Sequence, residues 1–186
     1  MPDHCPACQT EVVKEGAYFF CPADLLCPGQ QIGRIIHYAS RQALNIQGLN
    51  DKTVRQLVEK RLVNNIADLY RLSYDDLLQL EGFAKKSAYK LHQAIQDSKK
   101  TKLDRFLYAL GIHHLGEHMA TVLAWSFRIL ESLEKASLSE LREVSEVGPE
   151  TASSVRTFFD QKENRKVLRD LVEAGMEIEE MGEAKI

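Results

Sequence analysis

The sequence lacks any hydrophobic run near the roughly 18 to 20 residues that a membrane-spanning helix needs. Its first residues have neither the basic nor the apolar region of a secretory signal, so we expect a cytoplasmic protein. Aromatic residues are scarce, at 8% with a single tryptophan, and form no array suited to stacking on single-stranded bases. There is also no nucleophile beside a placed base and no phosphate-binding glycine loop. The residues therefore do not support an enzyme in its own right.

Cysteine occurs only four times, always within the first 27 residues, in the pattern C-x2-C, twelve residues, C-x5-C. The four residues are Cys5, Cys8, Cys21 and Cys27. Four thiolates suit tetrahedral zinc, with Zn–S near ~2.3 Å and no open position for catalysis. Disulfides and a redox C-x-x-C fit less well without an export signal or a thioredoxin-like βαβ context. We predict a structural zinc finger over residues 1–30, where apolar residues are too few for a core and the metal supplies stability.

The net charge of −3 hides an uneven distribution of charge along the chain. Residues 31–110 hold 14 Lys or Arg and 8 Asp or Glu, whereas residues 111–186 hold 9 and 15. A polyanion would therefore meet mainly the central segment. Charge runs also serve simply to keep a surface solvated, so charge alone does not identify a partner.

After residue 30 the sequence repeats with a period of 32 to 34 residues. The repeats are anchored on the hydrophobic residues Leu49, Phe83, Leu115 and Val147. An aliphatic residue precedes each anchor by three positions, a small or β-branched residue follows it by five, and an aliphatic follows it by eight. The glycines beside the anchors are Gly48, Gly82, Gly116 and Gly148, where we expect a positive φ or close approach to a partner. Each repeat indicates a helix, a tight turn and a second helix.

A longer period pairs the first repeat with the third and the second with the fourth. Ala43 and Leu44, for example, reappear 66 residues later as Ala109 and Leu110. We therefore predict a mostly α fold without strands after residue 30: a small four-cysteine zinc finger and four tandem helix-hairpin-helix motifs arranged as two double-hairpin subdomains. The predicted boundaries are 1–30 for the finger, 31–100 and 101–176 for the subdomains, and 177–186 for an acidic tail that we expect to fray.

The turns are suited to binding a phosphate backbone. A short loop that leads into a helix presents free backbone N–H groups, and the helix dipole adds partial positive charge there. Phosphate oxygens fit this position without any base being read. The predicted DNA-binding residues are Gly48, Asn50, Lys52, Thr53, Gly82, Lys85, Lys86, Ser87, Gly116, Gly148 and Thr151. Binding should be independent of sequence and steeply dependent on salt.

The third and fourth hairpins are less favourable for DNA. Glu146 and Glu150 weaken the case for the fourth, which is either structural or binds through its main chain and the Thr151 hydroxyl alone. The third hairpin contains His113, His114 and His118, which we interpret as surface or packing histidines. Metal ligation is the less favoured alternative, because no partner ligands lie at a suitable spacing.

These features resemble a known family. The chain closely resembles the zinc finger and the start of the helix-hairpin-helix domain of bacterial NAD-dependent DNA ligases. The likeness lies in Cys5-Pro-Ala-Cys8, Cys21, Cys27-Pro-Gly-Gln30 and residues 36–49. Residues 57–60, 67–70 and 106–112 and the Gly116-Glu117 pair extend the likeness, which reaches about Gly175. The C-x5-C spacing departs from the commoner C-x4-C of the family.

The resemblance implies the non-catalytic, DNA-binding part of a ligase that seals nicks in replication and repair. The K-x-D-G motif of the adenylated lysine is missing; the nearest string, Lys102-Leu-Asp-Arg105, lacks the glycine. We therefore expect no ligation by this chain alone, and NAD and Mg²⁺ would act only in the full-length enzyme.

The resemblance also implies the partners: duplex or nicked DNA, and the adenylation and OB-fold domains of the same ligase. We expect a monomer in the bacterial cytoplasm, associated with the nucleoid. Two alternatives stay open. One is a stand-alone helix-hairpin-helix adaptor in DNA repair, and the other is a protein-interaction scaffold whose acidic second half binds a basic partner.

Overall fold

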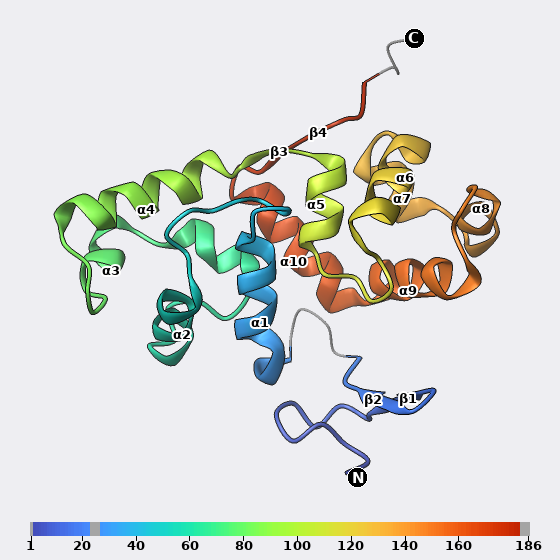
Figure 1. The fold of residues 1–186 in the computed structure, drawn as a ribbon, viewed down its shortest axis with the longest axis horizontal. Helices are drawn as coiled ribbons and strands as arrows, with labels where there is room; N and C mark the ends of the chain where they lie inside the picture. The colour runs from blue at the N-terminus through green and yellow to red at the C-terminus, as the bar shows by residue number, and fades with distance from the viewer. Residues whose placement is uncertain (1, 23–26, 183–186) are drawn as a thin grey trace.

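The structure, a computed structural model, describes residues 2–22 and 27–182. Residues 183–186 of the predicted acidic tail and residues 23–26 of the predicted finger lie outside the described residues. The chain begins with a small knuckle that contains the antiparallel strands β1 (Val13–Glu15) and β2 (Tyr18–Phe20). A larger helical body follows it (Figure 1). The predicted mostly α fold is confirmed.

The helical body consists of short helices joined by tight turns. In chain order they are α1 (Pro28–Ala39), α2 (Asp51–Glu59), the 3-10 helix η2 (Ile66–Arg71), α3 (Tyr74–Leu78), α4 (Lys85–Asp97), α5 (Leu103–Ala109), α6 (Glu117–Phe127), α7 (Leu130–Lys135), α8 (Leu138–Glu143), α9 (Pro149–Asp160) and α10 (Lys162–Glu173). Within the described part of the chain, no helix is both long enough and apolar enough to cross a bilayer.

Four helix–turn–helix units carry the predicted repeat: α1–α2, α3–α4, α5–α6 and α8–α9. In every unit the anchor N–H donates to the carbonyl three residues earlier, at 3.0 to 3.3 Å. The positions five and eight residues after the anchor are at most 2% exposed in all four units. These positions are Val54, Ala88, Ala120 and Ala152, and Leu57, Leu91, Leu123 and Val155. The four units therefore share the same turn hydrogen bond and bury residues at equivalent positions.

The residue before each anchor has a positive φ in all four units, as the third residue of a type II turn requires. In the first two units this residue is Gly48 (φ 89°) or Gly82 (φ 83°). In the last two units it is His114 (φ 64°) or Glu146 (φ 71°), although a side chain is disfavoured in this region. The same turn is thus made with glycine in one half of the body and with a bulky side chain in the other.

Gly116 and Gly148 occupy a different position from the first two glycines, one residue after the anchor. Their φ angles of −79° and −77° are extended, and they are the N-cap residues of α6 and α9. Asn50 and Ala84 are the equivalent N-caps of α2 and α4. A positive φ at Gly116 and Gly148 is therefore contradicted, and their close approach to a binding partner stays a prediction. No heavy atom beyond its neighbours in the chain would lie within 4 Å of a Cβ at either position.

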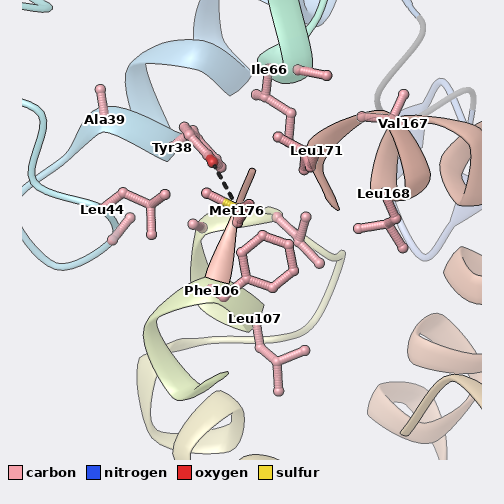
Figure 2. Packing of buried hydrophobic residues seen from close by; sticks show 14 of the residues in the cluster. Tyr38, Ala39, Leu44, Ile66, Phe106, Leu107, Val167, Leu168, Leu171 and Met176 are labelled. Carbon is pink, nitrogen blue, oxygen red and sulfur yellow. Dashed lines mark hydrogen bonds between the residues drawn. The ribbon is translucent and has the colours of Figure 1, made fainter. Parts of the chain in front are cut away.

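A single hydrophobic core runs through the whole helical body. Tyr38 of α1 is completely buried and lies near Phe106 of α5 (Figure 2). Its hydroxyl is 2.7 Å from that of Tyr70 in η2 and 3.7 Å from the sulfur of Met176. Burial raises the pKa of Tyr38 well above its usual range. Because α10 packs on η2 and α5 packs on α1, residues 31–100 and 101–176 share this core.

A two-stranded parallel sheet lies near the C-terminal end of the helical body. Strand β3 (Lys100–Lys102) pairs with β4 (Glu177–Glu179), and the Lys100 ammonium lies 3.4 Å from the Glu179 carboxylate. Two expectations are therefore wrong: strands do occur after residue 30, and the tail is paired rather than frayed from Glu177 to Glu179. The side chain of Ile178 packs against the core, which explains why this stretch is held.

The first helices of the first and third units, α1 and α5, are joined by two reciprocal arginine–carbonyl hydrogen bonds. The Arg34 guanidinium on α1 donates to the carbonyl of Gly111, at 3.3 Å, just beyond the end of α5. In return, the Arg105 guanidinium on α5 donates to the carbonyl of Ala43, at 3.1 Å, just beyond the end of α1. A cation at the carbonyl end of a helix is favoured by the helix dipole, so each helix stabilises the end of the other.

Candidate metal centre and nucleic-acid interface

The structure brings the four cysteines of the knuckle together. Their sulfur atoms all lie within 4.8 Å of one another. The Sγ atoms of Cys5 and Cys27 are 3.7 Å apart, and those of Cys8 and Cys21 are 3.4 Å apart. Such a cluster of four sulfur ligands can hold one metal ion, and soft thiolate donors favour zinc or another thiophilic metal.

The start of α1 completes this cluster. Cys27 is the N-cap of α1, and the Gln30 side chain donates to the Cys21 carbonyl at 3.1 Å. A Cβ on Gly29 would lie 2.9 Å from the Cβ of Ala7, which is closer than folded proteins allow. Glycine at this position lets the first turn of α1 pack against the turn that carries the first cysteine pair. The cluster is therefore fixed to the helical body as well as within the knuckle.

The surroundings of the thiols differ within the cluster. Hydrogen bonds with the side chain and backbone of Thr10 lower the pKa of Cys8 to about 6, and the two side chains are 3.2 Å apart. Burial raises the pKa of Cys27. A bound cation would favour the thiolate form at all four sites, so metal binding and thiol ionisation are linked.

The turns of the first two units face one groove of about 740 Å³. Of the predicted DNA-contact residues, it is lined by Gly48, Asn50, Lys52, Thr53, Gly82 and Ser87. Lys85 and Lys86 do not line it but lie exposed in the first turn of α4. Two turns that are 34 residues apart in the sequence thus present backbone and lysine side chains to the same space.

Gln56 on α2 fixes the second turn relative to the first unit. Its side-chain amide donates to the Glu81 carbonyl at 3.2 Å and accepts from the Glu81 N–H at 2.8 Å. Sequence reasoning missed this residue. The only signal was a polar side chain directly before Leu57, the aliphatic residue eight positions after the anchor.

The predicted role of the two hydroxyl groups is not supported by where they lie. Thr53 is only 3% exposed, so its hydroxyl has little access to a phosphate. The Ser87 hydroxyl accepts from the N–H of Ala84 at 2.9 Å and donates to the Ala84 carbonyl at 3.2 Å. In α2 the Asn50 side chain accepts from the Thr53 N–H at 3.0 Å. Asn50 and Ser87 thus stabilise the helix starts, which leaves the lysines and the remaining N–H groups of the first helical turns to meet an anion.

The lysines around the first two turns carry uncompensated charge. Within residues 2–22 and 27–182, no ion pair is recorded for Lys52, Lys85, Lys86 or Lys90. Arg55, in contrast, is paired with Asp51 across one helical turn at 2.7 Å. The positive charge of this face is therefore concentrated on exposed lysines at the starts of α2 and α4.

Hydrogen bonds join the turns of the third and fourth units. The Thr151 hydroxyl on α9 donates to the His114 carbonyl at 3.3 Å. His118 on α6 lies 3.4 Å from the Glu146 carboxylate. The Thr151 hydroxyl, for which a phosphate contact was predicted, thus makes a hydrogen bond within the body. Gly116 and Gly148 lie at the starts of α6 and α9, close to these ties.

The histidines of the third turn have a partner that sequence spacing concealed. His113 and His114 lie 2.7 and 2.5 Å from the two oxygens of Glu15 on β1, almost a hundred residues away in the sequence. These hydrogen bonds lower the pKa of Glu15. The expectation that no partner ligand is present is therefore wrong.

Comparison with known proteins places these features in a family context. A family described as a SAM-like helix-hairpin-helix tandem matches residues 40–97, and one described as a helix-hairpin-helix motif matches residues 105–168. Proteins named DNA ligase are 43% identical over 175 residues in Alkaliphilus oremlandii, 46% over 178 in Nitrosococcus oceani and 42% over 197 in Pseudomonas fluorescens.

These alignments cover 94%, 95% and 98% of this chain. They cover only 26%, 26% and 25% of the relatives, so the chain spans about a quarter of the length of the curated relatives that it matches. The predicted resemblance to the C-terminal region of DNA ligases is confirmed.

Proposed function

We propose that this chain, which corresponds to the C-terminal region of a DNA ligase, holds duplex DNA by its sugar–phosphate backbone. The observation that carries the proposal is the shared groove of the first two turns. It combines two helix starts, two glycine turns and lysines that have no acidic partner among residues 2–22 and 27–182. Helix starts and lysines bind phosphate oxygens without regard to the bases.

The turns use the geometry that such binding needs. At Gly48 and Gly82 no side chain projects from the tip of the turn, so a phosphate can approach the backbone closely. Lys52 and Lys86 follow at equivalent positions in α2 and α4 and supply charge. Binding of this type releases counterions, and the affinity should fall steeply as salt is added.

The four units form, in our proposal, two double helix-hairpin-helix subdomains over residues 31–100 and 101–176. The matching turn hydrogen bonds support four equivalent motifs, and the two matched family segments each fall within one half. The shared core would keep the halves at a fixed angle, so that the second half orients the first on DNA.

The four cysteines would hold a structural Zn²⁺. All four ligands come from the protein, which leaves no position for substrate, and the knuckle has too little apolar surface to fold without the metal. The residues Cys5, Cys8, Cys21 and Cys27 would then keep the knuckle folded against the start of α1, and they would have no direct part in any reaction.

Within the full-length protein, this region would keep nicked DNA in place while other domains seal it. Those partners would be the adenylation and OB-fold domains of an NAD-dependent ligase, with NAD and Mg²⁺ acting there. Adding an adenylation-domain fragment in trans distinguishes this role from that of an independent repair adaptor, because only a ligase region should restore sealing.

Titration of fluorescent nicked and intact duplexes of two unrelated sequences tests the proposal. The zinc-loaded chain should bind both sequences equally and lose at least about tenfold in affinity between 50 and 200 mM salt. Absence of binding at the lower salt would contradict the proposal and favour a protein partner for the acidic second half. Strong preference for one sequence would contradict backbone recognition.

A further inference from the structure

A second cluster of metal-binding groups lies outside the cysteine site. Glu15 on β1 and His113 and His114 in the third turn place one ligand atom each within 4.8 Å of one another. The Nε2 atoms of the two imidazoles lie 2.7 and 2.5 Å from opposite oxygens of the same carboxylate. Three ligands from two distant segments of the chain therefore converge on one point.

The backbone and the neighbouring rings hold these groups in place. His114 adopts a φ of 64° at the position where the first two units have glycine. A side chain is disfavoured in this region, yet it brings the second imidazole to Glu15. The ring of Phe20 on β2 lies 4.5 Å from that of His113, and the two imidazole centroids are 4.0 Å apart.

The donor set matches a borderline transition metal. Imidazole nitrogen with one carboxylate oxygen suits Zn²⁺, Co²⁺ or Ni²⁺, whereas Ca²⁺ and Mg²⁺ prefer oxygen alone. At Zn–N and Zn–O distances near 2.0 to 2.1 Å, tetrahedral ligand atoms are about 3.3 Å apart. The imidazoles need to withdraw from Glu15 by less than about 1 Å to accept such an ion. The side chains of Glu15, His113 and His114 are 39%, 46% and 28% exposed, so water can fill the remaining position.

We propose that Glu15, His113 and His114 form a second divalent-metal site, which takes Zn²⁺ or a similar ion and fastens the cysteine knuckle to the third hairpin. The site is separate from the four-cysteine cluster in its donors and in its role. The cysteines fold the knuckle, whereas this ion joins the folded knuckle to the body. The inference does not depend on DNA binding.

Metal stoichiometry tests the proposal. After equilibrium dialysis against buffered micromolar zinc, the chain should hold two zinc ions, and the His113→Ala/His114→Ala variant should hold one. His118→Ala is the matched control, because His118 is also an exposed histidine of the third unit with a carboxylate near its ring. This control should keep two ions. A Glu15→Gln variant should lose the second ion or bind it at least tenfold more weakly.

Cobalt spectra show which site each ion occupies. Thiolate-bound Co²⁺ absorbs strongly in the visible and near ultraviolet, whereas Co²⁺ bound by nitrogen and oxygen absorbs weakly. The first equivalent should give the thiolate spectrum in all variants, which shows that the knuckle still folds. One ion per wild-type chain would overturn the proposal and leave a histidine–carboxylate hydrogen bond alone. A second ion retained by the double histidine variant would overturn it as well.

Discussion

The two halves of the helical body share a backbone and differ in the side chains at their turns. In the first half the turns expose glycine and are followed by Lys52 and Lys86, which have no acidic partner in the described chain. In the second half the same turn positions carry His114 and Glu146, and both residues are tied to neighbouring parts of the molecule. One fold thus provides a surface for an anion in one half and a set of internal contacts in the other.

The hairpin geometry alone therefore does not make a binding surface. All four turns have equivalent hydrogen bonds and bury equivalent residues. What differs is whether the tip of the turn is open and what charge follows it. In our account the first half meets DNA, and the second half supports it through the shared core and the contact with the knuckle.

The largest expected effect comes from charge reversal in the first half. The Lys52→Glu/Lys86→Glu variant should weaken duplex binding on the order of 100-fold at low salt and reduce the salt slope by about 2, because two phosphate contacts are lost. Fluorescence anisotropy at several salt concentrations measures both quantities. Lys162→Glu/Lys166→Glu on α10 makes the same change in net charge away from the groove and should have less than about a threefold effect. Equal losses in the two variants would show that net charge, and no particular surface, governs binding.

Adding positive charge to the second half should raise the affinity for duplex DNA, by a smaller factor. Glu150 stands at the position equivalent to Lys52 and Lys86, so Glu150→Lys should tighten duplex binding by roughly 3- to 10-fold. The same anisotropy titration applies, with Glu163→Lys on α10 as the control of equal charge. If Glu150→Lys binds no better than this control, the fourth turn does not approach DNA at all.

The turn residues themselves should affect stability in opposite directions. Gly48→Ala forces a side chain into a φ of 89° and should lower the free energy of unfolding by about 1 to 2 kcal/mol. Glu146→Gly removes strain at a φ of 71° and should raise the free energy of unfolding by up to about 1 kcal/mol. Its contact with His118 is exposed and contributes little. Urea denaturation of the zinc-loaded chain measures both changes, and a destabilised Glu146→Gly variant would contradict the assigned strain.

The smallest expected effect is the pH dependence of the contact between the knuckle and the third unit. Hydrogen bonds from His113 and His114 lower the pKa of Glu15 below its usual value of 4.5. Because the folded-state pKa is depressed, the contact contributes stability above pH 4.5 and loses it as the pH falls through the folded-state pKa. Carboxyl NMR of the chain with metal bound only to the cysteines should show this low pKa. The titration should return to the ordinary range in the His113→Ala/His114→Ala variant.

Much of the fold followed from the sequence because burial is periodic. The residues five and eight positions after the anchors are buried, since each must pack inside a helix–turn–helix unit. The anchors Leu49, Leu115 and Val147 are buried as well, whereas Phe83 is half-buried. The spacing of the cysteines predicted their convergence for a similar reason, because short loops limit where thiols can lie. Local patterns were sufficient for both features.

Contacts between distant segments could not be predicted in this way. Glu15 meets His113 and His114 only because the knuckle folds back on the third unit. Glu177 pairs with β3 only because the core brings the C-terminal segment beside the middle of the chain. The burial and the internal contacts of the hydroxyls could not be predicted either. Thr53 appeared suited to phosphate, but packing against the core buries it.

Amide chemical shifts during a DNA titration would locate the binding surface on one half of the body or on both. A short duplex is added to ¹⁵N-labelled, zinc-loaded chain at low salt, and the backbone N–H signals of all four turns are followed together. We expect the largest changes at residues 48–53 and 82–87, with much smaller ones at 114–118 and 146–151. Equal changes in both halves, or changes confined to the third and fourth turns, would contradict this expectation.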